Sequence, residues 1–313
     1  MELIRGSHNL QTHHRQCVAT IGNFDGVHLG HQAVLKQVTD QASQMNLPAV
    51  VIILEPQPNE FFSGDNAVAR LTRFREKLQL FKCFSIDRVL SLPFNTTLSS
   101  MPAKDFIDKI LVAGLDIRYL VVGDDFRFGN QRQGDFTMLV EAGKQHDFPV
   151  VNMKTFSFEG ERVSSTRIRA ALAEGDLALA EKLLGRHYGM SGRVAHGDKR
   201  GRTIGFPTAN LHLHRKKSPL QGVFAVEMLG IEDKPVAGIA NVGTRPTVDG
   251  SKTLLEVHLF DYNADLYGRY VHVNFLHKIR NEMKFESFEQ LQQQIKQDAQ
   301  QAREWLKQNK KII

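Results

Sequence analysis

Residues 22–31 carry the strongest chemical signal in the sequence, and they read Gly-Asn-Phe-Asp-Gly-Val-His-Leu-Gly-His. The three glycines let the backbone approach a ligand closely because they have no side chain. His28 and His31 are three apart, so both imidazoles lie on one face of the helix that the following residues predict. Unpaired N–H groups at a helix start attract an anion, and neighbouring imidazoles suit a phosphate that gains charge during reaction. The segment therefore predicts a nucleotide-phosphate site.

Two widespread phosphate motifs are absent from the sequence. No G-x-x-x-x-G-K-[ST] loop occurs, and no G-x-G triplet is present for a dinucleotide fingerprint. An ordinary strand–loop–helix corner with surface histidines remains the simpler alternative for an H-x-x-H pair alone. The three glycines and Asp25 at this spacing favour the phosphate site.

In its form G-N-F-D-G-V-H-x-G-H, the segment resembles the HIGH-type motif of nucleotidylyltransferases, as found in the FMN adenylyltransferase half of bacterial bifunctional riboflavin kinase/FAD synthetases. The run S-S-T-x-x-R at residues 164–169 matches the second ATP motif of that family. Alone, this run would be ordinary helix capping with a solvated arginine. The resemblance implies catalytic roles for His28 and His31 at the α-phosphate and for Arg169 at the leaving pyrophosphate. It also implies ATP contacts by Gly22, Asn23, Phe24, Asp25, Gly30, Ser165 and Thr166.

The resemblance places two further loops near the flavin and adenylate pockets. The expected flavin-binding residues are Pro56, Pro58, Asp125, Phe126 and Phe128. The alternative for the second loop is that its aromatic side chains pack inward. The reaction needs no covalent nucleophile or general base, because the phosphate of FMN is already an anion near neutral pH. It can attack the α-phosphorus of ATP in line, and the protein aligns the two and offsets charge.

A second strong signal lies at residues 197–210, where a basic, glycine-spaced loop leads into Pro-Thr-Ala-Asn. Such a loop can lie over phosphates, and the hydroxyl of Thr208 and amide oxygen of Asn210 are hard ligands that suit Mg²⁺. A basic hairpin loop is the plainer alternative. The run G-F-P-T-A-N resembles the riboflavin kinase signature, which implies a metal site at Thr208 and Asn210. It also implies ATP contacts by Gly197, Lys199, Gly201, Gly205, Pro207, Thr208 and Asn210.

The catalytic glutamate of the riboflavin kinases falls on Glu256 in this resemblance. Strand alternation puts Glu256 and His258 on one face. A carboxylate there can orient the ribityl 5′-hydroxyl and accept its proton late in a loose transition state. A surface glutamate on a half-exposed strand is the alternative, and His258 is expected to be solvated or structural.

The elements that must position these residues follow two patterns that change at Gly185. Before it, apolar runs alternate with helical patterns, which predicts a parallel sheet covered on both faces, with ligands beyond the carboxyl ends of its strands. The predicted strands are 17–21, 49–54, 87–92, 119–122 and 150–154, and four predicted helices lie near 31–45, 72–83, 102–112 and 134–146. A fifth helix, with Ser164 or Ser165 as its N-cap, is predicted to run to Glu174, and a sixth is predicted between its cap Asp176 and Gly185.

After Gly185, short runs at 222–229, 236–242, 253–259 and 270–277 predict an antiparallel, barrel-like domain. A capping pair, Ser287 and Gln290, and an apolar stripe predict a C-terminal helix that packs against it. The predicted fold is therefore a Rossmann-like α/β domain, residues 1–184, followed by an antiparallel β-barrel domain, residues 185–313. The resemblance implies that the first is a nucleotidylyltransferase domain and the second a riboflavin kinase domain.

Composition limits partners and compartment. At 313 residues, with 42% hydrophobic and 24% charged residues, the chain suits two ordinary soluble domains, with no membrane-length apolar run and no secretory signal. The net charge of +6 combines −1 up to Leu184 (20 Lys and Arg, 21 Asp and Glu) with +7 after it (20 against 13). The scattered basic residues favour a small polyphosphate over nucleic acid. Cys17 and Cys83, in or beside apolar segments, predict buried reduced thiols and a cytoplasmic location.

Together these features predict a bifunctional enzyme that acts on small molecules, without nucleic-acid or membrane partners, as a monomer or weak homo-oligomer. Its C-terminal domain would phosphorylate riboflavin with ATP and Mg²⁺, and its N-terminal domain would adenylylate FMN to FAD. Two alternatives are a nucleotidylyltransferase for another phosphorylated acceptor and a non-catalytic flavin- or nucleotide-binding regulator. The Pro-Thr-Ala-Asn loop and Glu256 argue against the first alternative. The presence of the whole set of predicted catalytic and metal-binding side chains argues against the second, namely His28, His31, Arg169, Thr208 and Glu256.

Overall fold

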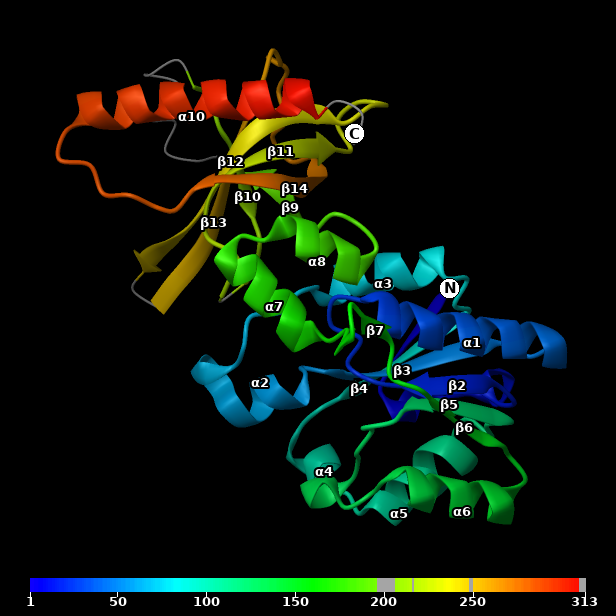
Figure 1. The fold of residues 1–313 in the computed structure, drawn as a ribbon. Helices are drawn as coiled ribbons and strands as arrows, with labels where there is room; N and C mark the ends of the chain where they lie inside the picture. Colours follow the sequence, from blue (N-terminus) through cyan, green and yellow to red (C-terminus); the bar gives the residue numbers. More distant parts are fainter. Residues whose placement is uncertain (196–205, 216, 248–249, 310–313) are drawn as a thin grey trace. The chain divides into compact units, whose positions relative to one another are not determined.

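A computed structural model describes residues 1–195, 206–215, 217–247 and 250–309. The chain forms two compact units (Figure 1). Unit 1 comprises residues 1–68 and 72–164, and unit 2 comprises residues 69–71 and 165–313. The predicted boundary after residue 184 lies within the second of these units and stays a prediction about independently folding domains.

Unit 1 is built on a six-stranded parallel sheet in the order β1-β4-β3-β2-β5-β6. Five strands confirm the predicted ones. The sixth, β1, was not predicted, because its residues at the polar N-terminus show no apolar run and it forms an edge that pairs only with β4. The strands are β1 (Glu2–Arg5), β2 (Val18–Ile21), β3 (Ala49–Glu55), β4 (Arg88–Pro93), β5 (Tyr119–Gly123) and β6 (Val150–Met153).

Helices cover both faces of this sheet because successive residues of each strand point to opposite sides (Figure 1). Val18 and Val51 belong to the apolar cluster with α1 (Leu29–Met45) and α3 (Phe74–Cys83). Their neighbours, such as Ala19, belong to the cluster on the other face, with α5 (Ala103–Phe106), the π-helix η4 (Ile107–Val112) and α6 (Phe136–His146). Short elements complete the unit: η1 (Ser7–Asn9), η2 (Thr12–His14), α2 (Pro58–Ser63), η3 (Gly64–Asn66), α4 (Thr96–Ser99), η5 (Asn130–Arg132), β7 (Ser157–Phe158) and β8 (Glu161–Arg162).

The sheet order places a topological switch point beside β2. From β2 the chain moves to β3 and β4 on one side, and β5 and β6 lie on the other. The segments that follow β2 and β5 therefore leave a crevice at the carboxyl ends of the strands, where ligands bind in open parallel sheets. Residues 22–28 and 124–129 are these segments.

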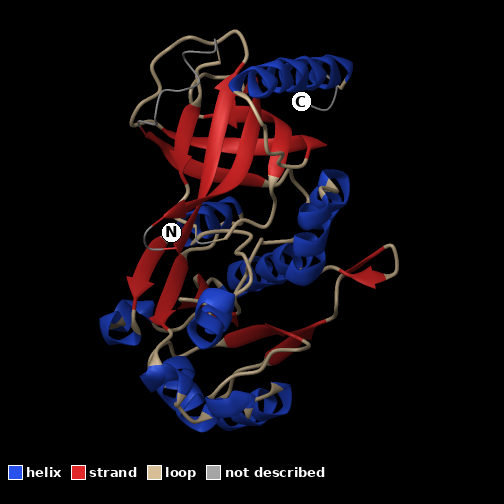
Figure 2. Cartoon of the chain, turned by 90° about the vertical axis from the view of Figure 1, so that its left-hand side faces the viewer, coloured by secondary structure: helices blue, strands red, loops and turns tan. Residues whose placement is uncertain are grey.

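Unit 2 contains a closed antiparallel barrel, as predicted, in the order β10-β13-β12-β11-β14-β9 (Figure 2). Among the described residues, two helices precede it and one follows it. The elements are α7 (Ser165–Glu174), α8 (Leu177–Leu184), β9 (Gly189–Ala195), β10 (Ala209–His212), β11 (Gly222–Leu229), β12 (Val236–Thr247), β13 (Gly250–Leu259), β14 (Tyr270–Arg280) and α10 (Phe288–Gln308).

The C-terminal helix α10 packs on the barrel, as its apolar stripe predicted. Ala299, Ala302 and Leu306 share an apolar cluster with Val223 and Ile239 of the barrel strands. A buried ion pair reinforces the contact, since the guanidinium of Arg280 donates to both carboxylate oxygens of Asp298 at 2.7–3.0 Å. The barrel and its helix are thus one packed body.

A short segment between α2 and α3, Ala69–Leu71, belongs to unit 2. The Nε of Arg169 donates to the carbonyl of Ala69 at 2.6 Å, and Nη1 of Arg215 donates to that of Arg70 at 2.6 Å. The carbonyl of Leu71 accepts from the hydroxyl of Tyr188 at 3.2 Å. The segment is thus held through its backbone carbonyls, and the side chain of Leu71 is fully buried as well.

The two cysteines differ in exposure. Cys17 is fully buried, and burial raises the pKa of its thiol to about 12, so it is an inert packing residue. Cys83 is exposed at the last residue of α3, where the apolar face of the helix ends. Burial is therefore confirmed for Cys17 and wrong for Cys83, and both are free thiols.

Candidate functional sites

Residues 22–28 form the turn between β2 and α1, and His28 and His31 stand together at the start of the helix. His28 is the N-cap of α1, and its Nδ1 accepts a hydrogen bond from the backbone N–H of His31 at 3.3 Å. The two rings are stacked, with centroids 3.6 Å apart and planes 17° from parallel. A Cβ at Gly30 would lie 3.3 Å from the His28 ring, so glycine leaves space for this stack. The predicted shared face is confirmed.

The protonation of both rings follows from their surroundings. Since Nδ1 of His28 accepts a hydrogen bond, its neutral ring carries the proton on Nε2. Burial lowers the pKa of His31 well below its usual value, and His28, Lys77 and Arg162 lower it further. Nδ1 of His31 is buried and has no hydrogen-bond partner in the part of the chain that the structure describes. A buried polar atom of this kind is what a ligand would satisfy.

The rear of the turn is tied to the residues that begin α3. The Oδ1 of Asp25 accepts from the backbone N–H of Thr72 at 3.0 Å and from its hydroxyl at 3.3 Å. The hydroxyl oxygen of Thr72 accepts in turn from the N–H of Gly26 at 3.0 Å. Asp25 is only 3% exposed, so its carboxylate holds the turn in shape. An ATP contact at Asp25 would therefore involve its backbone.

The protein interior also engages two other turn residues, one through its ring and one through its backbone carbonyl. The ring of Phe24, 2% exposed, meets that of Phe81 edge-to-face with centroids 5.6 Å apart. The Nζ of Lys77, a fully buried side chain, donates to the carbonyl of Asn23 at 2.5 Å. Sequence reasoning missed Lys77 and Thr72. The available signal was spacing, because Lys77 lies three residues after Phe74 and four before Phe81, on the apolar face of the predicted helix.

The loop after β5 presents two exposed acids, Asp124 and Asp125, and buries one aromatic ring. Asp125 is exposed and forms an ion pair with Arg162 of the β7–β8 hairpin at 2.8 Å. Phe128 is 8% exposed within the apolar core, Phe126 packs against that core, and their rings stack at 5.6 Å. Phe128 therefore packs inward, as the alternative in the sequence analysis expected. Contact between the flavin and Phe126 or Phe128 stays a prediction. Sequence reasoning missed Arg162, because this residue belongs to none of the motifs recognised in the sequence.

The loop after β3 lies next to the turn, because β3 and β2 are neighbours in the sheet. Pro58 is the first residue of α2, and Pro56 precedes it in the loop. Gln57 between them is 6% exposed, and its Nε2 has no hydrogen-bond partner among the described residues. The loop therefore carries an unsatisfied donor near the carboxyl edge of the sheet.

The second ATP motif begins α7 in unit 2. Ser165 is the first residue of this helix, Thr166 is exposed, and Arg169 is half-buried. The Nε of Arg169 is engaged by the carbonyl of Ala69, and a guanidinium has further N–H groups on its other nitrogens. The assignment of these residues to the ATP site stays a prediction.

In the barrel, three polar residues form one row across neighbouring strands. Glu256 of β13 is directly opposite Asn210 of β10 and directly opposite Asn241 of β12. Opposed residues share a face, and Glu256 lies on the face away from the buried Leu255 and Val257. The register thus brings together the predicted carboxylate and a predicted metal ligand, and it adds Asn241.

The Pro-Thr-Ala-Asn segment is attached to β13 beside this row. The Nδ1 of His258 donates to the carbonyl of Pro207 at 2.9 Å, and its ring meets Phe206 edge-to-face. The structural role expected for His258 is confirmed. Thr208 follows directly and is half-buried. The remaining predicted ATP contacts of this loop, Gly197, Lys199, Gly201 and Gly205, lie outside the described residues.

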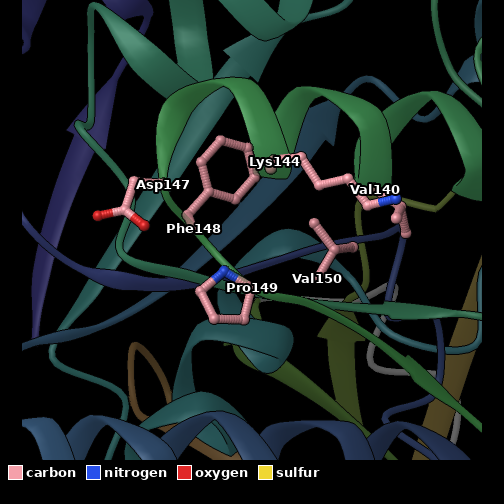
Figure 3. Close-up of a pocket in the computed structure, with 7 residues that line it drawn as sticks. Val140, Lys144, Asp147, Phe148, Pro149 and Val150 are labelled. Carbon is pink, nitrogen blue, oxygen red and sulfur yellow. The ribbon is translucent and has the colours of Figure 1, made fainter.

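Two other features of unit 1 are not sites for this chemistry. A shallow pocket of about 350 Å³ lies between the end of α6 and the start of β6 (Figure 3). Pro149 and Val150 line it at the amino end of the strand, opposite the carboxyl edge that carries the turn.

The second feature is a cluster of Glu2, His13 and His14 with ligand atoms within 4.8 Å of one another. The Nδ1 of His14 accepts from the backbone N–H of Gln11 at 2.9 Å, so Nε2 carries the proton and donates to Glu2 at 3.0 Å. A metal ion would need a free lone pair on a His14 nitrogen, but Nδ1 already accepts a hydrogen bond and Nε2 carries a proton. The cluster is therefore a hydrogen-bonded pair, His14 and Glu2, with the imidazole of His13 beside it.

Comparison with known proteins matches each half of the chain separately. The family model of FAD synthetase matches residues 10–167, and that of riboflavin kinase matches residues 184–306. The curated bifunctional riboflavin kinase/FMN adenylyltransferase of Escherichia coli K12 is 51% identical over 306 residues, covering 97% of this chain and 98% of its own. The protein of the same description from Haemophilus influenzae is 49% identical over 303 residues, with the same coverage.

A solved structure is also similar along the whole chain. The crystal structure described as a macrolide-efflux protein from Streptococcus pneumoniae has a TM-score of 0.80 at 32% identity, covering 95% of this chain and 97% of its own. Within the described residues of the present chain, no helix combines the length and apolar character needed to cross a membrane.

Proposed function

Because the chain belongs to the family of bifunctional riboflavin kinase/FMN adenylyltransferases, we propose roles for its residues in the two reactions of that family. Its C-terminal part phosphorylates riboflavin with ATP to FMN, and its N-terminal part transfers an adenylyl group from ATP to FMN, which yields FAD and pyrophosphate. The alternatives of another acceptor and of a regulator without turnover lose their support, since both family models match in this order.

The stacked histidines carry the assignment of the adenylyl site. The ring of His31 is neutral, and its buried Nδ1 has no hydrogen-bond partner among the described residues. The ring of His28 carries its proton on Nε2. Both rings donate to the non-bridging oxygens of the α-phosphate as charge develops there, while the N–H groups of the turn bind the phosphate chain. The FMN phosphate attacks in line, so positioning and charge stabilisation perform the catalysis.

The other groups of the adenylyl site hold the remainder of the two substrates. Ser165, Thr166 and Arg169 bind the leaving pyrophosphate with hydroxyl and guanidinium donors. The loops with Pro56, Pro58 and Asp125 border the flavin and adenylate pockets, and Phe126 and Phe128 support the second loop. Support for these roles is the motif match together with the position of both loops at the carboxyl edge of the sheet.

In the kinase part, the row of Asn210, Glu256 and Asn241 carries the assignment. Glu256 orients the ribityl 5′-hydroxyl and accepts its proton. The oxygens of Thr208 and Asn210 fit a hard cation and would hold Mg²⁺, which when bound offsets charge on the phosphates of ATP. Pro207 and the basic, glycine-spaced residues 197–205 would contact the nucleotide, as the motif match implies.

We further propose a cytoplasmic monomer or weak homo-oligomer whose partners are small molecules, with a domain boundary near residue 185. Support comes from the composition and from the break between the two family models, at residues 167 and 184.

The direct test is incubation of the pure full chain with riboflavin, ATP and Mg²⁺, with FMN and FAD separated over time. We expect FMN first and FAD after it. A matched reaction in excess chelator tests the metal proposal, and undiminished FMN formation there would refute it. Gel filtration coupled to light scattering tests the oligomeric state.

A further inference from the structure

Lys77 is a buried charge that none of the roles above uses. It lies in the second turn of α3 and is among the largest fully buried side chains of the chain. A buried ammonium costs free energy unless hydrogen bonds and neighbouring dipoles compensate it. A lysine at such a position therefore points to a specific function for its charge or its hydrogen bonds.

The hydrogen bond of Lys77 acts on the backbone of the phosphate turn. Its Nζ donates to the carbonyl of Asn23 at 2.5 Å. The C=O and N–H of a planar trans peptide point in opposite directions, so this bond aims the N–H of Phe24 away from Lys77. Among the described residues, the N–H groups of Asn23 and Phe24 have no hydrogen-bond partner. They are thus available to an acceptor from outside the chain.

The charge of Lys77 also reaches the stacked histidines. It is one of the groups that lower the pKa of His31, after burial and His28. The ring of Phe24 lies near one aromatic ring of α1 and one of α3, since its centroid is 5.1 Å from that of His31 and 5.6 Å from that of Phe81. An apolar wall of this kind weakens screening, so a positive charge behind the turn acts strongly on an anion in front of it.

We propose that Lys77 is a positioning residue for adenylyl transfer: its ammonium holds the Asn23–Phe24 peptide so that the turn presents its N–H groups to the triphosphate of ATP, and it supplies a fixed positive charge behind them. The proposal rests on the assignment of this turn to the ATP phosphates. Lys77 touches the turn and not the reacting atoms.

The test compares Lys77→Met with Lys82→Met in the full chain. Methionine keeps the length and apolar stem of lysine without its charge, and Lys82 is an exposed lysine of the same helix. We expect Lys77→Met to lower kcat/KM for ATP in FAD formation by roughly 10–100-fold, the range for a lost hydrogen bond to a charged group. We expect the change mainly as a higher KM for ATP and weaker inhibition by pyrophosphate, while the KM for FMN stays unchanged. Lys82→Met matches the wild type.

A merely structural role gives a different result, namely a smaller active fraction with an unchanged KM for ATP, and this result would overturn the proposal. Lys77→Gln keeps an N–H donor without the charge, and we expect a KM for ATP between those of wild type and Lys77→Met. If Lys77→Met fails to fold, as judged by thermal unfolding, Lys77→Gln decides by the same criterion. His31→Ala separates the two proposals. Normal FAD formation by His31→Ala refutes the assignment of the site itself. Loss of FAD formation in His31→Ala, together with normal FAD formation in Lys77→Met, refutes only the role of Lys77.

Discussion

At the level of single residues, the site chemistry depends on few side chains with definite protonation states. The stacked rings of His28 and His31 are held by a backbone hydrogen bond and by burial, so their donors are oriented before substrate arrives. Such preorganisation is what stabilises charge in a transition state. Glu256 depends in the same way on its strand register, which places Asn210 and Asn241 beside it.

Replacing His31 with Ala should slow FMN-to-FAD conversion roughly 10²–10³-fold, the loss typical of one preorganised donor to a transition-state oxyanion. ATP binding should persist, because the turn and the residues of α7 still hold the phosphates. FMN should accumulate in a coupled assay that starts from riboflavin. FAD production at the wild-type rate would disprove the assignment of this turn.

Replacing Glu256 with Gln should abolish riboflavin phosphorylation and leave FMN-to-FAD conversion near normal. The carboxylate is assigned to the ribityl hydroxyl, which has no part in adenylyl transfer. Asn241→Ala serves as a comparison in the same row, and we expect it to retain part of the kinase activity since it removes no base. Equal loss of both activities in Glu256→Gln would show that Glu256 supports structure.

Burial of His31 also predicts a pH dependence of stability. The pKa of His31 in the folded chain is lowered well below the usual 6.5. Below about pH 6.5 the unfolded chain therefore binds a proton at this residue more readily than the folded chain does. The contribution of the neutral ring is therefore complete above the unfolded pKa and is lost as pH falls below it. His31→Gln should show a smaller drop in unfolding temperature between pH 7.5 and 5.5 than the wild type, with the exposed His8 replaced by Gln as control. Equal drops in His31→Gln and wild type would contradict this.

At the level of elements, the helix α10 is attached to the barrel by packing and by one buried ion pair. Asp298 is 2% exposed and accepts from Arg280 and from Nε2 of Gln294 at 2.8 Å. In contrast, Asp261, which follows β13 and pairs with Arg303 of α10, is exposed. The two pairs offer an internal comparison of buried and solvated charges.

Replacing Asp298 with Ala should destabilise unit 2 by about 3–5 kcal/mol, because it leaves the Arg280 guanidinium without its buried partner. Asp261→Ala should have a much smaller effect, since solvent already screens that pair. Urea unfolding followed by the fluorescence of Trp305, which lies on α10 and stacks on His277, measures both variants. Similar losses in the two variants would mean that burial does not decide the strength of these pairs.

At the level of the whole molecule, the two activities should be separable, since each family model matches its own part of the chain. Unit 2 nevertheless begins at Ser165 and includes α7 and α8, whose connecting turn lies close to Lys278 of the barrel. Arg215 also uses carbonyls of Arg70 and Leu71 as acceptors. The barrel thus has partners that precede the proposed boundary in the chain.

A fragment 185–313 should make FMN from riboflavin and never FAD. A fragment 165–313 should do the same with a higher unfolding temperature, because it keeps α8 against β14. Activity and thermal unfolding of both fragments check this. A well-folded fragment 185–313 without kinase activity would count against independent domains.

Much of this molecule could be predicted from its sequence, because local patterns determine it. Apolar runs between helical periods gave five parallel strands, and the glycines with His28 and His31 marked the turn at the sheet's switch point. Where the local pattern was weak the prediction failed: β1 is a short polar edge strand, and Cys83 lies at the end of an apolar helix face.

Only the tertiary structure decided which distant residues support the site. Lys77, Thr72 and Arg162 contact the turn or the loop after β5 from elements far along the chain. Spacing puts Lys77 on an apolar helix face, but it does not identify the residue that Lys77 contacts. Register between strands paired Asn210 and Asn241 with Glu256. Periodicity reports which side of an element is buried, whereas packing and strand pairing determine what it meets there. Residue types in the sequence therefore determined the chemistry, and the folded chain determined its geometry and charge.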